Sequence, residues 1–475
     1  MKPFSSPSDP DTEDPDSGGA GLFDALLAAG GVRTAVDDRA WLRAMLDAQA
    51  ALARAQARLG TVPAAAAEAI TDACRRHPFD LAAIGADATG AGNPVVPLVT
   101  ALRAAVGPDV GRYVHAGATS QDILDTAAML IVQRALAPLL GDLDRAADSA
   151  ARLADAHRDT LLPARTLLQQ ALPTTFGLVA AGWLTALDSA ADRLTTTRAQ
   201  VPAVQLGGAA GTLASFGTDG PALVDLFAAE LGLAAPPLPW HTDRSRLADL
   251  AGALGATAGS LSKIARDVTL HAQTEVGEVA EERPGGSSTL PHKRNPVAAV
   301  TAIACAAQAP GLVATLLASM TQEHQRAAGA WHAEWRALRA LLESVGSAAY
   351  WLRTCLDGLR VDAVRMRANL DLTGGALLAE RVSGALAERL GRQQANAIVK
   401  AALADPGPAG SSLVDRLAAD PQVSALLTRE RLGQLLDPAG YLGAHRELID
   451  RALAARGKRL PELAASSASS EEEQT

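Results

Sequence analysis

The segment 281–296, Glu-Glu-Arg-Pro-Gly-Gly-Ser-Ser-Thr-Leu-Pro-His-Lys-Arg-Asn-Pro, carries the densest set of side chains that could do chemistry. Its glycines and serines predict an exposed, flexible loop of the kind that closes over a substrate. His292, Lys293, Arg294 and Asn295 follow one another, and cationic and amide side chains bind carboxylates well. Pro296 can begin the next helix, whose N-terminal dipole also favours an anion. These features predict an anion site, while a solvated linker between helices stays open.

A second segment, 112–126, places small polar residues where a helix should begin. Gly117, Thr119 and Ser120 stand there, and backbone N–H groups with small hydroxyls at a helix start can bind an anion. Spacing alone favours a simpler interpretation, in which Thr119 or Ser120 caps the helix and Asp122 stands in its first turn.

Two other polar segments are harder to interpret. Residues 165–176 include two adjacent glutamines in an apolar stretch, and the simplest prediction is a loop between helices capped by Thr174 or Thr175. Residues 323–335 contain Arg326 and two histidines. Because His324 and His332 are eight positions apart, the spacing does not support a metal site.

Long helices are expected to position these segments. Apolar residues recur every three or four positions in six stretches, namely 41–60, 121–158, 176–194, 247–282, 297–320 and 332–358. Hydrophobic residues make up 48% of the chain but aromatic residues only 3%, so alanine, leucine and valine must form the core. The predicted fold is all-α, with a central bundle of long helices. Several stretches are apolar on more than one face, which favours burial against other subunits over a large monomeric bundle.

Composition also predicts the division of the chain. Residues 1–19 are acidic and rich in Pro, Ser and Gly, and 465–475 are similarly polar, so both are expected to be disordered tails. Breaks between helical stretches predict an N-terminal helical domain over 20–112, a central domain over 113–360 and a C-terminal domain over 361–464.

Several classes of protein are disfavoured. The chain has 475 residues and a net charge of −9, whereas nucleic-acid binding requires a basic surface. No long charge-free apolar run is apparent, so no membrane span is expected. Three widely spaced cysteines, Cys74, Cys305 and Cys355, predict reduced thiols and a cytoplasmic location. The sequence has no metal-ligand spacing and no glycine-rich phosphate loop, so neither a metal nor another cofactor is expected.

The loop at 286–295 resembles the signature of the fumarase/aspartase superfamily, Gly-Ser-Ser-x-(Met/Leu)-Pro-x-Lys-x-Asn, and residues 115–126 resemble its second signature region. Further segments resemble the 3-carboxy-cis,cis-muconate cycloisomerases, a lactone-forming branch; these are 92–98, 165–173, 205–212, 330–335 and 391–395. The resemblance covers about residues 20–460. Leu167 stands where many lyases of the superfamily have a histidine, and Val300 where many have a glutamate. Both departures disfavour a lyase built on a His–Glu pair.

The resemblance implies a three-domain helical fold, a homotetramer with sites shared between subunits, and lactonisation of a small tricarboxylate. It implies that Ser287 is the catalytic acid/base and that Lys293 and Asn295 bind the carboxylate that takes up charge. Thr119 and Ser120 would bind a second carboxylate, with His115 and Gln169 nearby. Arg326 is either a further substrate-binding residue or part of a surface salt bridge. Two alternatives remain: a fumarate-releasing lyase of the same superfamily, such as an adenylosuccinate lyase-like or other C–N lyase, and a non-catalytic helical oligomer.

Overall fold

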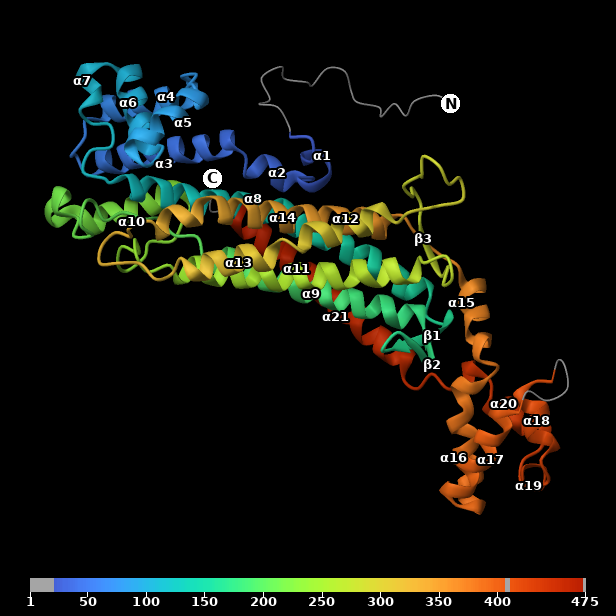
Figure 1. Ribbon diagram of the computed structural model, residues 1–475. Coiled ribbons are helices and arrows are strands. Elements are labelled where there is room, and N and C mark those ends of the chain that lie inside the picture. The colour runs from blue at the N-terminus through green and yellow to red at the C-terminus, as the bar shows by residue number, and fades with distance from the viewer. Residues whose placement is uncertain (1–20, 406–410, 473–475) are drawn as a thin grey trace. The chain divides into compact units, whose positions relative to one another are not determined.

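The structure, a computed structural model, describes residues 21–405 and 411–472, and helices account for most of them (Figure 1). The predicted tail at 1–19 lies outside the described residues, as do 473–475. Seven helices come first, namely α1 (Asp24–Leu27), α2 (Gly31–Ala35), α3 (Asp38–Arg58), α4 (Ala64–Arg76), α5 (Leu81–Ala91), α6 (Val95–Val106) and α7 (Pro108–Gly111). Asp37 caps α3, since its carboxylate accepts the Ala40 N–H at 2.7 Å. This helix confirms the periodicity seen over 41–60.

Four long helices form the bundle, and they are α8 (Ser120–Ala156), α9 (Phe176–Gln200), α11 (Ser245–His271) and α14 (Ala330–Asp357). Their buried side chains are mainly Ala, Leu, Ile and Val, as the aromatic-poor composition requires. In α8, every residue from Gln121 to Val132 is buried. That continuous burial accounts for the lack of a polar face in this part of the sequence.

The prediction that one helix runs from 247 to 282 is wrong. The helix α11 ends at His271, and the chain turns back so that the N–H of Glu278 donates to the carbonyl of His271 at 2.9 Å. Gly277 adopts φ 61° in this turn, a conformation that glycine reaches without steric cost. A short strand, β3 (Val279–Glu281), follows and pairs with β4 (Leu359–Val361).

The stretch 297–320 forms two helices instead of one, α12 (Val297–Ala306) and α13 (Ala309–Ala318). Pro310 lies in the first turn of α13, where its missing N–H and its ring are tolerated but could not continue a helix from α12. By length and composition, Ser120–Ala156 and Val297–Ala318 would each suffice to cross a membrane, contrary to the expectation from the sequence. The first is mostly buried by protein, and the second is broken into two short helices. The expectation of no membrane span stays a prediction.

A β-hairpin replaces the loop predicted over 165–176. Its strands β1 (Leu161–Thr166) and β2 (Gln169–Thr175) are antiparallel and joined by Leu167 and Leu168. Both leucines adopt left-handed backbone conformations, with φ of 51° and 64°. The expected cap is partly confirmed, because Thr175 Oγ1 accepts the Leu178 N–H at 3.2 Å at the start of α9.

Shorter elements complete the chain. Two elements lie between α9 and α11, the 3₁₀ helix η1 (Ala214–Asp219) and the helix α10 (Gly220–Leu231). The elements after β4 are α15 (Ala363–Leu370), η2 (Asp371–Thr373), η3 (Ala376–Leu378), α16 (Ala379–Leu390), α17 (Arg392–Ala404), α18 (Leu413–Ala419), α19 (Pro421–Ser424), α20 (Arg429–Leu435), η4 (Pro438–Gly440) and α21 (His445–Glu472). The C-terminal helices have an apolar core of their own, which includes Val382, Leu386 and Leu432. Helix α21 continues past residue 465 as far as Glu472, and the tail predicted from residue 465 stays a prediction. Alanine and glutamate in this stretch favour a helix.

Contacts group the chain into two compact units. Among the described residues, the first unit comprises 21–139, 197–255 and 304–350, and the second comprises 140–196, 256–303 and the described residues from 351 on. Each unit is therefore assembled from segments far apart in the sequence. The three-domain division expected from the breaks between helices stays a prediction.

Candidate active site

The start of α8, in the first unit, carries the first group of predicted site residues. Ser120 is the first residue of the helix, and the Thr119 N–H donates to Asp122 Oδ2 at 2.9 Å. The predicted place of Asp122 in the first turn is thus confirmed. The hydroxyl-bearing Thr119 and Ser120 are both half-buried, so they stand at a partly accessible helix start.

His115 lies just before this helix in a left-handed conformation, with φ 60°. Its Nδ1 is 2.9 Å from Nε2 of Gln49, a buried residue of α3. Burial lowers the pKa of His115 to about 4, and the opposing effect of the Asp122 carboxylate is smaller. The imidazole is therefore neutral at pH 7, and it can offer one hydrogen-bond donor and one acceptor but no positive charge.

Arg326 reaches the same region from the loop between α13 and α14. Its guanidinium donates to the carbonyls of Gly208 and Gln325, each at 2.6 Å. These partners are backbone oxygens, so they do not form the surface salt bridge that was one of the two alternatives for Arg326. Burial lowers the pKa of Arg326, while Asp122 and Asp125 oppose this shift.

The first unit also contains a buried ionic network that no motif in the sequence predicts. The Arg244 guanidinium donates to Asp125 at 2.8 Å and to Glu334 at 2.6 Å, and all three side chains are buried. Trp331 Nε1 donates to Asp125 at 2.9 Å, and Gln322 Nε2 donates to Glu334 at 2.8 Å. The network joins α8, α14, the residue just before α11 and the loop that carries Arg326. No local signal could reveal it, because Arg244 is 119 positions from Asp125 and 90 from Glu334.

The loop after β3, in the second unit, carries the second group. Gly285 and Asn295 close its base through two backbone hydrogen bonds of 2.9 Å. Ser287 is half-buried, and its Oγ accepts backbone N–H groups from Leu290 at 3.1 Å and Thr289 at 3.3 Å. Lys293 is exposed. The loop therefore presents a hydroxyl oxygen held by two donors, together with an accessible ammonium group.

The helix start behind this loop already holds an anion from the chain itself. The Glu281 carboxylate accepts the N–H groups of Ala298 at 3.1 Å and Ala299 at 2.9 Å, in the first turn of α12. The expectation that this helix dipole contributes to substrate binding is therefore wrong, since Glu281 occupies it.

Gln169, the last predicted site residue, begins β2 beside the hairpin turn and is exposed. A buried carboxylate fixes the hairpin. Glu278 accepts two hydrogen bonds from Arg165, at 2.6 and 2.9 Å, and one from Asn369 at 2.8 Å, and it lies 2.6 Å from His271 Nδ1. Although burial acts in the opposite direction, these partners lower the pKa of Glu278 to about 2.

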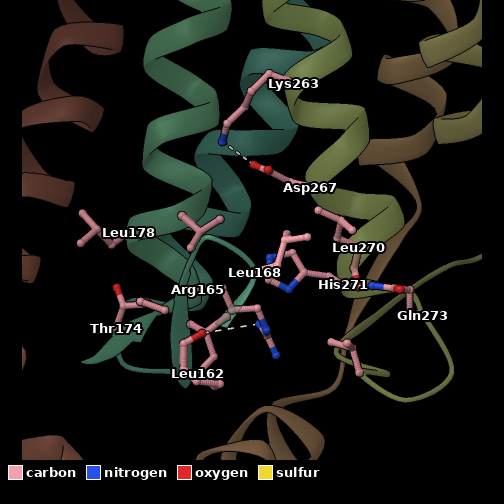
Figure 2. Close-up of a pocket in the computed structure, with 14 residues that line it drawn as sticks. Leu162, Arg165, Leu168, Thr174, Leu178, Lys263, Asp267, Leu270, His271 and Gln273 are labelled. Carbon is pink, nitrogen blue, oxygen red and sulfur yellow. Dashed lines mark hydrogen bonds and ion pairs between the residues drawn. The ribbon is translucent and has the colours of Figure 1, made fainter. Parts of the chain in front are cut away.

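A cavity of about 650 Å³ lies between the hairpin and the helices α9 and α11 (Figure 2). Arg165, Leu168 and His271 line it, and Lys263 pairs with Asp267 on its wall. None of the predicted site residues lines this cavity. Its charged groups are paired with one another or with Glu278, so it offers no free charge for a carboxylate among the residues that line it.

The structure thus divides the predicted site residues of one chain into two groups. The first unit holds His115, Thr119, Ser120 and Arg326, and the second holds Gln169, Ser287, Lys293 and Asn295. Within the described parts of the chain, no three His, Cys, Asp or Glu side chains cluster as metal ligands. The expectation of a site without metal or cofactor stays a prediction.

The sequence matches two models of known protein families. A family model described as lyase matches residues 24–311, and one described as adenylosuccinate lyase C-terminus matches 375–452. The chain therefore belongs to the lyase family of the fumarase/aspartase superfamily, and the predicted all-α fold of that family is confirmed.

Particular members are similar over nearly the whole chain. A 3-carboxy-cis,cis-muconate cycloisomerase of Bradyrhizobium diazoefficiens is 48% identical over 91% of this chain and 97% of its own. A nitrosuccinate lyase of Streptomyces davaonensis is 47% identical over 94% and 97%. The crystal structure of the 3-carboxy-cis,cis-muconate lactonizing enzyme from Pseudomonas putida matches with a TM-score of 0.87 and 44% identity, covering 92% of this chain and 99% of that one.

Proposed function

We propose that this protein is a 3-carboxy-cis,cis-muconate cycloisomerase, which interconverts that tricarboxylate and 4-carboxymuconolactone in the catabolism of protocatechuate. The similarity to cycloisomerases over nine-tenths of the chain carries the proposal. The sequence also retains the serine, lysine and asparagine of the superfamily loop, at Ser287, Lys293 and Asn295.

In the reaction, a carboxylate oxygen adds to a conjugated double bond, and a proton is delivered to the neighbouring carbon. That carbon is α to another carboxylate, so an enolate-like dianion develops on this group in the transition state. Donors aimed at the developing charge lower the barrier, as does an acid/base group close to the α-carbon.

Ser287 is proposed as that acid/base group. A serine hydroxyl is a weak base unless its alkoxide is stabilised. The N–H groups of Thr289 and Leu290 point at Oγ, and two such donors favour an anionic oxygen. Exclusion of water by closure of the loop would strengthen both interactions.

The remaining residues are proposed to bind carboxylates. Lys293 supplies positive charge and Asn295 an amide donor to the carboxylate that takes up charge. Thr119 and Ser120 donate hydroxyl hydrogen bonds to a second carboxylate. His115 contributes a neutral N–H, which fits its lowered pKa. Gln169 and Arg326 are proposed as further donors to the substrate.

We also propose a cytoplasmic homotetramer whose sites combine segments of several subunits. Exposed apolar side chains support assembly: Val300 on α12 is 52% exposed and Leu317 on α13 is 46% exposed. At the hairpin tip, Leu167 is 96% exposed. Apolar groups in such positions are typical of surfaces that pack against another subunit.

A second candidate is nitrosuccinate lyase activity, because a relative of that name is 47% identical over 94% of the chain. Loss of a proton α to a carboxylate and of nitrite would convert nitrosuccinate to fumarate. Both candidate reactions involve charge on a carboxylate and a proton at its α-carbon, so the same residues could serve either one.

The deciding experiment supplies each substrate separately to the purified protein. Ultraviolet absorbance follows loss of the conjugated diene of 3-carboxy-cis,cis-muconate, and release of fumarate follows the lyase reaction. The proposal predicts consumption of the muconate without fumarate. Fumarate release from nitrosuccinate, with the muconate left unchanged, would establish the second candidate.

A further inference from the structure

The Asp122 carboxylate, in the first turn of α8, is fully buried, and both of its oxygens accept hydrogen bonds. Its Oδ1 accepts the Gly207 N–H at 2.9 Å and lies 2.7 Å from His241 Nε2. Its Oδ2 accepts the N–H groups of Thr119 at 2.9 Å and Gly208 at 3.0 Å. A carboxylate offers about four lone-pair positions, so these four partners use its whole capacity.

The four partners come from three separate parts of the chain. Thr119 precedes α8, the two glycines lie between α9 and η1, and His241 precedes α11. The Gly208 carbonyl in turn accepts the Arg326 guanidinium at 2.6 Å. A single carboxylate therefore sets the positions of the Thr119–Ser120 helix start and of Arg326 relative to each other.

The glycines allow this close approach. A Cβ atom at Gly207 would lie 2.6 Å from Cε1 of His241 and 2.9 Å from Cβ of Pro239. Gly208 adopts φ 67°, and a Cβ there would lie 3.1 Å from the Gly117 carbonyl oxygen. The local sequence thus exposes two backbone N–H groups to Asp122 where side chains would separate them.

We propose that Asp122, supported by His241, is a positioning residue for the carboxylate-binding part of the active site. Its side chain is buried and its lone pairs are occupied, so it neither touches the substrate nor takes part in proton transfer. It acts through Thr119, Ser120 and Arg326. The inference rests on the proposed function only in requiring a substrate with carboxylates.

The test is Asp122→Asn in the full-length protein. An amide presents N–H hydrogens where the carboxylate accepted them, so at least one backbone partner loses its acceptor. If the groups that bind a carboxylate remote from the reacting atoms are misaligned, the enzyme binds the substrate and the transition state less tightly by a similar amount. The KM for 3-carboxy-cis,cis-muconate should rise about tenfold or more, while kcat changes less than about threefold.

Hydrogen exchange supplies a readout that does not depend on activity. Peptides covering 113–121 and 205–212 should exchange faster in Asp122→Asn than in the unchanged protein, while the rest of the chain is unaffected. An unchanged KM contradicts the proposal. A fall in kcat with KM and exchange unchanged also contradicts it, because Asp122 would then act in the chemical step.

A second variant and a control complete the design. His241→Phe removes one partner and keeps a ring, so KM should rise about threefold; if Asp122→Asn fails to fold, this variant decides. Asp142→Asn changes another buried aspartate of α8, which pairs with Arg145 and Arg353, and should leave KM unchanged. If the protein accepts nitrosuccinate instead, the proposed function fails, and the same KM comparison with that dicarboxylate still tests Asp122.

Discussion

Ser287 is the residue on which the proposed chemistry depends most. Its Oγ accepts hydrogen bonds from two backbone N–H groups, and the residue is half-buried in its loop. Ser287→Ala should lower kcat by about 10³-fold or more, because a positioned acid/base group is lost. The exposed neighbour provides a matched control, and Ser288→Ala should retain activity within about threefold. Equal effects of the two substitutions on kcat would remove Ser287 from the mechanism.

Lys293 tests the charge requirement of the site. Lys293→Met keeps most of the side-chain length and removes the positive charge, so binding and rate should both suffer. We expect kcat/KM to fall at least about 10²-fold, with KM raised and kcat lowered, because the charge is used in both states. Steady-state kinetics at constant ionic strength measures this. A change in thermal stability with normal kinetics would make the residue structural.

The Glu278 carboxylate makes the stability of the folded protein depend on pH. Its folded-state pKa of about 2 lies below the usual 4.5, so the folded protein binds this proton more weakly than the unfolded chain. The resulting stabilisation is complete above pH 4.5 and is lost as the pH falls towards 2. Glu278→Gln should therefore lower the free energy of unfolding by about 3 kcal/mol at pH 7, and by less at pH 3.

Urea titrations at both pH values, at one protein concentration, measure this difference. Glu282→Gln is the control, since its pair with Arg360 is exposed and should contribute less than about 1 kcal/mol. A Glu278→Gln effect that does not shrink on acidification would show that the charge of Glu278 is not what stabilises the hairpin.

At the scale of residues, sequence reasoning found the groups with local signatures. The loop at 286–295 and the helix start at Thr119 and Ser120 were both recognisable from neighbouring residues. The partners that fix them were not, because Asp122 meets Gly207 and His241 only after folding. Glu281 also falls in the predicted loop, whereas its carboxylate caps α12, the helix whose start is predicted to favour an anion.

At the scale of elements, the hairpin β1–β2 is the feature that sequence reasoning missed. Apolar periodicity revealed the long helices correctly, since their buried faces repeat over many turns. The hairpin was not predicted because its turn is Leu167–Leu168, whereas two-residue hairpin turns prefer sequences such as Asn-Gly. The ends of α11 and α12 were not predicted either, because the turn at Gly277 follows the first and Pro310 lies just beyond the second.

The two leucines give the element-scale prediction. Holding each in a left-handed conformation costs of order 1 kcal/mol or more, and both side chains are exposed in the single chain. Leu167→Asn with Leu168→Gly relaxes the turn and removes the apolar tip. If the tip packs against another subunit, kcat/KM should fall at least about tenfold although the hairpin itself is less strained.

Leu238→Asn, at another highly exposed leucine, should leave kcat/KM unchanged and serves as the control. Full activity of the Asn-Gly variant, with unchanged assembly, would show that the leucines have only a local role.

At the scale of the whole molecule, the apolar composition is expected to be used in assembly. Light scattering should give a mass about four times the 48.7 kDa of one chain. Val300→Glu with Leu317→Glu places two charges on the exposed apolar sides of α12 and α13, and should yield smaller species with little activity. Leu426→Glu on the C-terminal part is the control. A fully active monomer would contradict sites shared between subunits.

The most direct test of the central claim compares kcat/KM for 3-carboxy-cis,cis-muconate and nitrosuccinate with one preparation of the enzyme. The account predicts at least about 10⁴ M⁻¹s⁻¹ for the muconate, with a product of unchanged mass, and at least about a hundredfold lower value for nitrosuccinate. The reverse ranking, with fumarate as the product, would contradict it.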